Sequence, residues 1–142
     1  MKILLVWPAV TNAEFYNILP LGLGYLAANL PAEHQVKLWD GVLNHSNNDK
    51  ILDEIETFKP DLIGISVWNF NLNSAKEIVD TIKQKYPNIL KIMGGPTVSG
   101  YKSKIFDIID ADYAFIGECE KSFRDFLELF NKKDQAFRNV KG

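Results

Sequence analysis

The sequence predicts an α/β fold, with a doubly wound sheet of five parallel strands in the flavodoxin-like order 2-1-3-4-5 and helices on both faces. Short apolar runs alternate with amphipathic runs along the chain, which is typical of right-handed βαβ units. The apolar runs are nearly continuous, as expected for strands buried on both faces. A chain of 142 residues is long enough for one domain with its own core.

Five strands are predicted from these apolar runs. The second alternates apolar and polar residues, which is typical of a strand at or near a sheet edge. The third is the most continuous, and the fourth ends in two glycines. The strands cover residues 2–7, 35–40, 61–68, 89–95 and 111–118.

Helices are predicted between the strands from apolar residues at helical spacing. The second begins at Asn47 or Asn48 and the third at Asn73 or Ser74, because Asn and Ser favour the N-cap position. Prolines end the first three helices. The others cover residues 21–30, 103–109 and 122–130. We expect one domain over residues 1–131 and a polar tail, or the start of a linker, over 132–142.

Composition excludes several classes of protein. The formal net charge is −2 with no basic stripe, so no nucleic-acid partner is expected. The single cysteine, Cys119, rules out a disulfide or a cysteine-built metal cluster within the chain and favours a reducing, cytoplasmic setting. No apolar run approaches the length of a membrane span. His34 and His45 show no metal-ligand spacing, and both are expected at the surface.

The ends of the strands are unusually small and polar. In open parallel sheets ligands bind beyond the carboxyl ends of the strands, near the point where the strand order reverses. The segments that reach this edge read WPAVTN, WDGVLN, SVWNFN, GGPTVSG and GECE. Their shared position on one edge of the sheet predicts a ligand site there.

Each of these signals also has a purely structural explanation. Gly94 and Gly95 either admit a ligand or form a turn with positive φ. Ser66 either binds a ligand or bonds to nearby backbone, and Trp68 either lines the site or belongs to the core. Gly117, Glu118 and Glu120 either line the site or begin a helix, because acidic residues favour a helix N-terminus.

The sequence lacks the complete motifs of other domains that use this edge of the sheet for binding or catalysis. No G-x-G-x-x-G follows the first strand, as a dinucleotide fold requires. The third strand ends in Ser66 rather than the aspartate of a phospho-receiver. The G-x-S-x-G elbow of a hydrolase is half present, since Trp68 stands at its last position. For a flavin phosphate, Thr11 alone offers a hydroxyl after the first strand.

The strand ends resemble the N-terminal cobalamin-binding domain of cobalamin-dependent radical S-adenosylmethionine enzymes, the class typified by magnesium-protoporphyrin monomethyl ester cyclase. The set is specific as a whole and covers nearly the entire chain in order. The matching segments are KILLVWP, LPLGLGYLAANL, VKLWDG, PDLIGIS, IMGGPT and IGECE.

The resemblance implies a cobalamin that lies across the carboxyl edge of the sheet, with its nucleotide tail inserted at the strands. Ser66 would donate to the benzimidazole, Gly94 and Gly95 would admit the tail, and Glu118 and Glu120 would accept bonds from corrin amides. The implied cofactor-binding residues are Leu21, Gly22, Asp40, Ser66, Val67, Trp68, Asn69, Gly94, Gly95, Pro96, Thr97, Gly117, Glu118 and Glu120.

Three departures from related families shape this expectation. The loop after the first strand lacks the D-x-H-x-x-G of corrinoid proteins such as methionine synthase, so that motif supplies no histidine to cobalt. Cys119 replaces the second glycine of the usual G-E-G-E, either as a small buried residue or as one that narrows the pocket. The C-x-x-x-C-x-x-C of the catalytic half is missing, so the iron–sulfur cluster and S-adenosylmethionine are assigned to an absent radical S-adenosylmethionine domain.

The resemblance therefore predicts a chain that binds cobalamin for methyl transfer or radical chemistry in a partner domain, rather than a catalyst by itself. The alternative is a receiver-like or degenerate protein-interaction domain of the same fold without a cofactor. A small flavoprotein is a third reading.

Overall fold

The computed structural model describes residues 1–9, 19–43, 49–132, 136 and 140. It contains a five-stranded sheet in the order β2-β1-β3-β4-β5, and every pair is parallel. The predicted fold class and strand order are confirmed. The strands are β1 (Lys2–Trp7), β2 (Gln35–Asp40), β3 (Leu62–Ser66), β4 (Leu90–Gly94) and β5 (Tyr113–Ala114).

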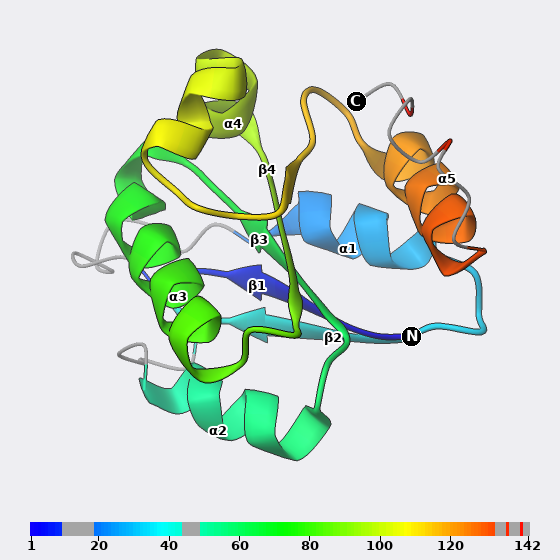
Figure 1. Ribbon diagram of the computed structural model, residues 1–142, viewed down its shortest axis with the longest axis horizontal. Helices are drawn as coiled ribbons and strands as arrows, with labels where there is room; N and C mark the ends of the chain where they lie inside the picture. The colour runs from blue at the N-terminus through cyan, green and yellow to red at the C-terminus, as the bar shows by residue number, and fades with distance from the viewer. Residues whose placement is uncertain (10–18, 44–48, 133–135, 137–139, 141–142) are drawn as a thin grey trace.

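Helices cover both faces of the sheet (Figure 1). On one face lie α1 (Leu21–Ala28) and α5 (Glu120–Asn131), and on the other lie α2 (Asp49–Phe58) and α3 (Leu72–Lys85). The helix α4 (Pro96–Tyr101) and the 3₁₀ helices η2 (Asn69–Asn71) and η3 (Lys102–Asp107) complete the described elements.

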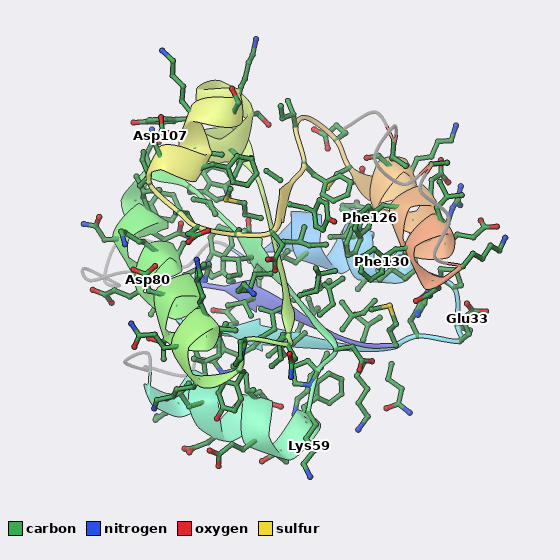
Figure 2. The ribbon with its side chains drawn as sticks, in the orientation of Figure 1. Glu33, Lys59, Asp80, Asp107, Phe126 and Phe130 are labelled. Carbon is green, nitrogen blue, oxygen red and sulfur yellow. The ribbon has the colours of Figure 1, made fainter. Side chains whose placement is uncertain are left out.

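Alternation along the strands divides the core into two layers. Ile63 and Ile65 of β3 pack with α2 and α3, whereas Leu62 packs with α1 and α5. This division follows from the two-residue period of a strand. Figure 2 shows side chains filling both layers, with Phe126 and Phe130 of α5 on the second face.

The predicted fifth strand is too long. Residues 111–118 were expected, but only Tyr113 and Ala114 pair with β4. After Phe115 the chain turns at Gly117, which has a φ of +77°, and its N–H donates to Ser99 Oγ at 2.9 Å. This contact draws the segment away from the sheet and toward α4.

A short helix, α4, follows β4 at residues for which no helix was predicted. Pro96 occupies the first helical position of α4, where proline is favoured because its missing N–H is not needed there. The helix predicted at residues 103–109 is a 3₁₀ helix over Lys102–Asp107. The third helix begins at Leu72 rather than at Asn73 or Ser74.

The surface position expected for His34 is wrong. This residue is 8% exposed, and its Nδ1 lies 3.3 Å from the amino group of Met1. Burial and the nearby positive charge lower the pKa of His34. The predicted cap residues Asn47 and Asn48, Thr11, His45 and most of the predicted tail lie outside the described residues.

Candidate functional site: a cavity at the carboxyl ends of the strands

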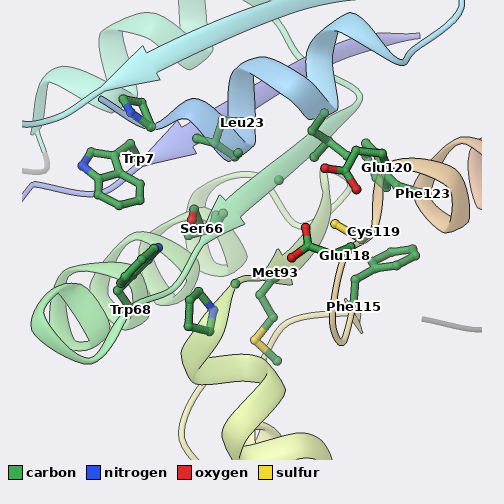
Figure 3. A pocket seen from close by; sticks show the side chains of 18 of the residues that line it. Trp7, Leu23, Ser66, Trp68, Met93, Phe115, Glu118, Cys119, Glu120 and Phe123 are labelled. Atoms are coloured by element: carbon green, nitrogen blue, oxygen red, sulfur yellow. The ribbon is translucent and has the colours of Figure 1, made fainter. Parts of the chain in front are cut away.

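A cavity of about 620 Å³ lies between the sheet and the helices α1 and α5, at the carboxyl ends of β3 and β4. Figure 3 shows its walls: Trp7 from β1, Leu23 from α1, Ser66 from β3 and Phe123 from α5. Its volume lies within the range of small-molecule sites. Its place at the strand ends is the one predicted from the sequence.

The cavity exists because the central strands present almost no side-chain volume on this face. Alternation and register place Gly64, Ser66 and Gly94 on the same side of the sheet as Leu62 and Ile92. Two of the three residues have no side chain and the third has only a hydroxymethyl group. A space is therefore left between these strand ends and the helices α1 and α5.

Gly94 and Gly95 have different reasons to be glycine. A Cβ on Gly95 would lie 2.8 Å from the carbonyl oxygen of Val67, and its φ is +108°, a conformation that side chains rarely adopt. A Cβ on Gly94 would find only Phe115 atoms, at 3.9 and 4.0 Å. Gly95 is thus required by the turn, whereas Gly94 leaves space that the backbone does not require.

Hydrogen bonds join the ends of β3 and β4. The N–H of Val67 donates to Gly94 O at 2.8 Å, and the N–H of Thr97 donates to Val67 O at 3.2 Å. The Thr97 hydroxyl donates to Asn69 Oδ1 at 2.9 Å. Val67, Asn69 and Thr97 therefore hold this edge together and do not line the cavity.

Asn71 fixes the turn that carries Ser66 and Trp68. Its Oδ1 accepts the Trp68 N–H at 2.8 Å, and its Nδ2 donates to Ser66 O at 3.2 Å. The residue is 1% exposed. Its place in the site was not predicted, although a polar residue that follows a buried strand and precedes a helix is a recognisable signal for such a turn.

Three aromatic residues pack together at one end of the cavity. The ring centroids of Trp7 and Trp68 are 5.9 Å apart, and those of Trp68 and Phe70 are 5.6 Å apart. Trp68 packs against the core and also lines the cavity, so both readings of this residue hold. Trp7 Nε1 is buried and has no hydrogen-bond partner among the described residues.

The connection from β5 to α5 brings acidic groups to the opposite wall (Figure 3). Glu118 is exposed, and Glu120 is half-buried as the first residue of α5. Burial raises the pKa of the Cys119 thiol to about 11, and the Glu120 and Glu118 carboxylates add to this effect. Cys119 is therefore a neutral thiol near pH 7.

Asp40 lies away from the cavity. Its Oδ1 accepts the N–H groups of Val42 at 2.9 Å and Leu43 at 3.2 Å, so its carboxylate stabilises the turn after β2. It stands on the same edge of the sheet as the other predicted residues but outside the cavity lining.

Ten of the fourteen predicted residues line the cavity, and Asp40, Val67, Asn69 and Thr97 do not. Those that line it are Leu21, Gly22, Ser66, Trp68, Gly94, Gly95, Pro96, Gly117, Glu118 and Glu120. The apolar lining could not be predicted from the sequence, because a core residue and a lining residue have the same hydrophobic pattern. The principal apolar residues that were missed are Trp7, Leu23, Leu26, Ile92, Phe115 and Phe123.

Two structural features bear on the class of site. Within the described ranges, no three or more His, Cys, Asp and Glu side chains gather to hold a metal ion. None of the helices in that part of the chain is long and apolar enough to cross a membrane. A doubly wound sheet with a largely apolar cavity at its carboxyl edge defines an α/β domain built to bind a small organic ligand.

The family is shown by the sequence. This chain belongs to the B12 binding domain family, whose sequence model matches residues 8–127. It is 31% identical, over 140 residues and 93% of its length, to the uncharacterized methyltransferase PH0819 of Pyrococcus horikoshii. The chain spans only about 30% of that relative.

Solved structures share the fold. The radical S-adenosylmethionine methyltransferase TsrM from Kitasatospora setae, with cobalamin and a [4Fe-4S] cluster bound, aligns over 94% of this chain and 25% of its own with a TM-score of 0.80 and 20% identity. The cobalamin-dependent radical enzyme OxsB, with aqua-cobalamin and S-adenosylmethionine bound, aligns over 93% of this chain and 19% of its own, with a TM-score of 0.78 and 24% identity.

The chain is thus a B12 binding domain that resembles the cobalamin-binding domains of radical S-adenosylmethionine methyltransferases. The receiver-like alternative gains no support. A response regulator, RcsB of Salmonella typhimurium, aligns with a TM-score of 0.64 at 9% identity, which shows a common fold alone.

Proposed function

We propose that this chain holds cobalamin across the carboxyl edge of its sheet for a cobalamin-dependent radical S-adenosylmethionine enzyme. The supporting observation is the empty volume above Gly64, Ser66 and Gly94. A nucleotide tail is a group of suitable size and shape for a cavity bounded by strand ends and two helices. The corrin ring would cover the opening, where Leu21, Trp68 and Glu118 are accessible.

The residues of the cavity suit this ligand. The Ser66 hydroxyl has no partner in the described part of the chain, so it is available to donate to the free benzimidazole nitrogen. Glu118 and Glu120, which line the cavity, would accept hydrogen bonds from amide groups at the corrin edge. The loop after β1 contains no histidine, so it offers cobalt no imidazole.

When bound, cobalamin supplies a cobalt centre for methyl transfer or radical redox chemistry, while the protein supplies orientation and exclusion of water. The iron–sulfur cluster and S-adenosylmethionine belong to a partner catalytic domain. That assignment rests on the relatives that are several times longer than this chain.

Loading with hydroxocobalamin tests the proposal. After incubation and gel filtration, the protein should retain a corrinoid whose visible spectrum reports whether the benzimidazole is bound to cobalt. Folded protein that elutes colourless would contradict the proposal.

A pair of glycine variants locates the site. Gly94→Val should keep the fold and lose the corrinoid, because its side chain would project beside Phe115 into the cavity. Gly100→Val is the matched control, since an added Cβ meets nothing within 4 Å there and Gly100 does not line the cavity. Equal retention of cobalamin by the two variants would exclude this cavity as the tail site.

A further inference from the structure

We infer that the outer face of α1 is a docking surface for an uncharged helix from the catalytic part of the same polypeptide. The α1 face is formed by Leu21, Tyr25 and Ala28, which recur at helical spacing and are all exposed, with Gly24 beside them. The inference rests on the proposed function and goes beyond it, because it concerns a helix face that leads away from the cavity.

Large apolar side chains are exposed on α1 and just before it. Leu19, Leu21 and Tyr25 are 67%, 64% and 64% exposed. They are three of the eight large hydrophobic residues that are exposed in the described part of the chain. Exposed apolar side chains that cluster in this way mark an interaction site, whereas single ones need no explanation.

The lack of charge separates α1 from the other long helices. The segment LPLGLGYLAANL, residues 19–30, contains no Asp, Glu, Lys or Arg. By contrast, α2, α3 and α5 carry charged side chains on their exposed faces, among them Asp53, Lys76 and Arg124. A helix that is hydrophobic all round is covered on more than one side, so α1 requires a second partner opposite the sheet.

Gly24 is a glycine that neither the fold nor the cavity explains. A Cβ added there would meet nothing within 4 Å, its φ is not positive, and it does not line the cavity. Glycine is less favourable than alanine inside a helix. A close approach from outside accounts for it, because the side chains at a contact set the distance between two packed helices.

The size of the α1 face favours a partner that is joined to this chain. Eight residues of helix span about 12 Å, and a contact of that length buries far less than the roughly 800 Å² per partner found between separate proteins. A covalent link raises the effective concentration, so a smaller interface suffices. This chain spans only about 30% of the relative PH0819, which therefore has the additional sequence that such a partner requires.

The chemistry of the α1 face excludes other classes of occupant. Because α1 carries no lysine or arginine, it offers no cation to nucleic acid or to an anionic membrane. Leu21 also lines the cavity, so a helix packed on α1 would lie beside the opening proposed for the corrin ring.

Thiol labelling of a Tyr25→Cys variant tests the inference. The variant is made in the 142-residue chain and in the complete polypeptide that contains this sequence, and mass spectrometry separates the label at position 25 from any at Cys119. We expect N-ethylmaleimide to label position 25 at least about tenfold more slowly in the complete polypeptide, where a helix covers it. Lys76→Cys, at an exposed position of α3, should label at equal rates in both.

Several results would overturn the inference. Equal labelling of position 25 in the two forms would show that the catalytic part does not cover α1. Slow labelling in both would show that the domain covers this face itself. Labelling of the 142-residue chain that slows as its concentration rises would assign the face to a second copy. A complete polypeptide without a catalytic part would also contradict it.

A pair of glycine variants tests the close approach. In the 142-residue chain, Gly24→Leu and Gly100→Leu should both unfold at a urea midpoint no lower than that of the wild type, because an added Cβ meets nothing within 4 Å at either position. In the complete polypeptide, Gly24→Leu alone should restore fast labelling of Tyr25→Cys. A lowered midpoint in Gly24→Leu would show that the domain itself requires this glycine, and labelling that stays slow would exclude the close approach.

Retention of hydroxocobalamin distinguishes this inference from the proposed function. A 142-residue chain that retains the corrinoid, together with equal labelling of position 25 in the two forms, would overturn the docking surface alone. A colourless chain whose position 25 is protected in the complete polypeptide would overturn cobalamin binding and leave the docking surface.

Discussion

Gly94 and Gly95 illustrate how adjacent residues of one type serve different ends. Gly95 has a positive φ, and a Cβ added there would lie 2.8 Å from Val67 O, whereas a Cβ added to Gly94 would make only ordinary contacts with Phe115. In the sequence both were candidates for a turn or for a ligand contact. Only the local geometry separates them.

This difference predicts that substitution by alanine will destabilise the protein at Gly95 but not at Gly94. Gly95→Ala should destabilise the protein by about 1–3 kcal/mol, because it forces an alanine into a strained conformation. Gly94→Ala should change the free energy of unfolding by no more than about 0.5 kcal/mol. Urea denaturation measures both, and comparable destabilisation by the two variants would show that Gly94 is also constrained by the backbone.

His34 gives the protein a pH dependence. Burial lowers its pKa in the folded state below the usual value of 6.5, so the unfolded chain binds a proton more readily. Stability should therefore be complete above pH 6.5 and should fall as the pH drops through that value. Denaturation at pH 7.5, 6.5 and 5.5 measures this loss.

The second histidine supplies the control. His34→Gln should reduce the slope of stability against pH between 7.5 and 5.5, whereas His45→Gln should leave the contribution of His34 unchanged. An identical slope in wild type and His34→Gln would assign the pH dependence to other groups.

At the scale of elements, the segment from β3 through η2 to α3 positions much of the site. Ser66 ends the strand, Trp68 precedes η2, and Asn71 bonds back to both. The periodicity of the sequence identified the strand and the helix, but periodicity carries no information about a single buried amide between them. The start of α3 was misplaced for this reason.

We predict that Asn71→Ala costs about 2 kcal/mol, because it leaves the Trp68 N–H and Ser66 O without their buried partner. Asn73→Ala, at an exposed position of α3, should change stability by less than about 0.5 kcal/mol. Urea denaturation compares the two, and equal values would remove the special role of Asn71. Corrinoid affinity should also fall in Asn71→Ala, whereas it should be unchanged in Asn73→Ala.

At the scale of the whole molecule, ligand binding and folding are linked. A ligand that binds only the folded chain at 100 times its dissociation constant adds about 2.7 kcal/mol to the free energy of unfolding. Hydroxocobalamin should therefore raise the midpoint of urea denaturation in the wild type. In Gly94→Val the midpoint should not move.

An unchanged midpoint in the wild type at saturating hydroxocobalamin would contradict specific binding to the folded state. Cyanocobalamin, whose cobalt carries a different upper ligand, controls for nonspecific effects of a coloured additive. It should give a shift of the same direction, because the proposed contacts are with the tail and the corrin edge.

The strand order, the two faces of the sheet and the edge on which the cavity lies could all be predicted from the sequence. These depend on alternation and on the connectivity of parallel strands, both of which are properties of the chain read in order. The positions of Ser66, Gly94 and Glu120 on this edge of the sheet could therefore be predicted from the sequence.

Which of these residues share a cavity depends on packing between segments that are distant in the sequence. Asp40 stands on the same edge but bonds to its own turn, and Thr97 bonds to Asn69 instead of lining the cavity. Leu23 and Phe123 look like ordinary core residues in the sequence. They became cavity walls because Gly64, Ser66 and Gly94 meet opposite them with too little volume to fill the layer.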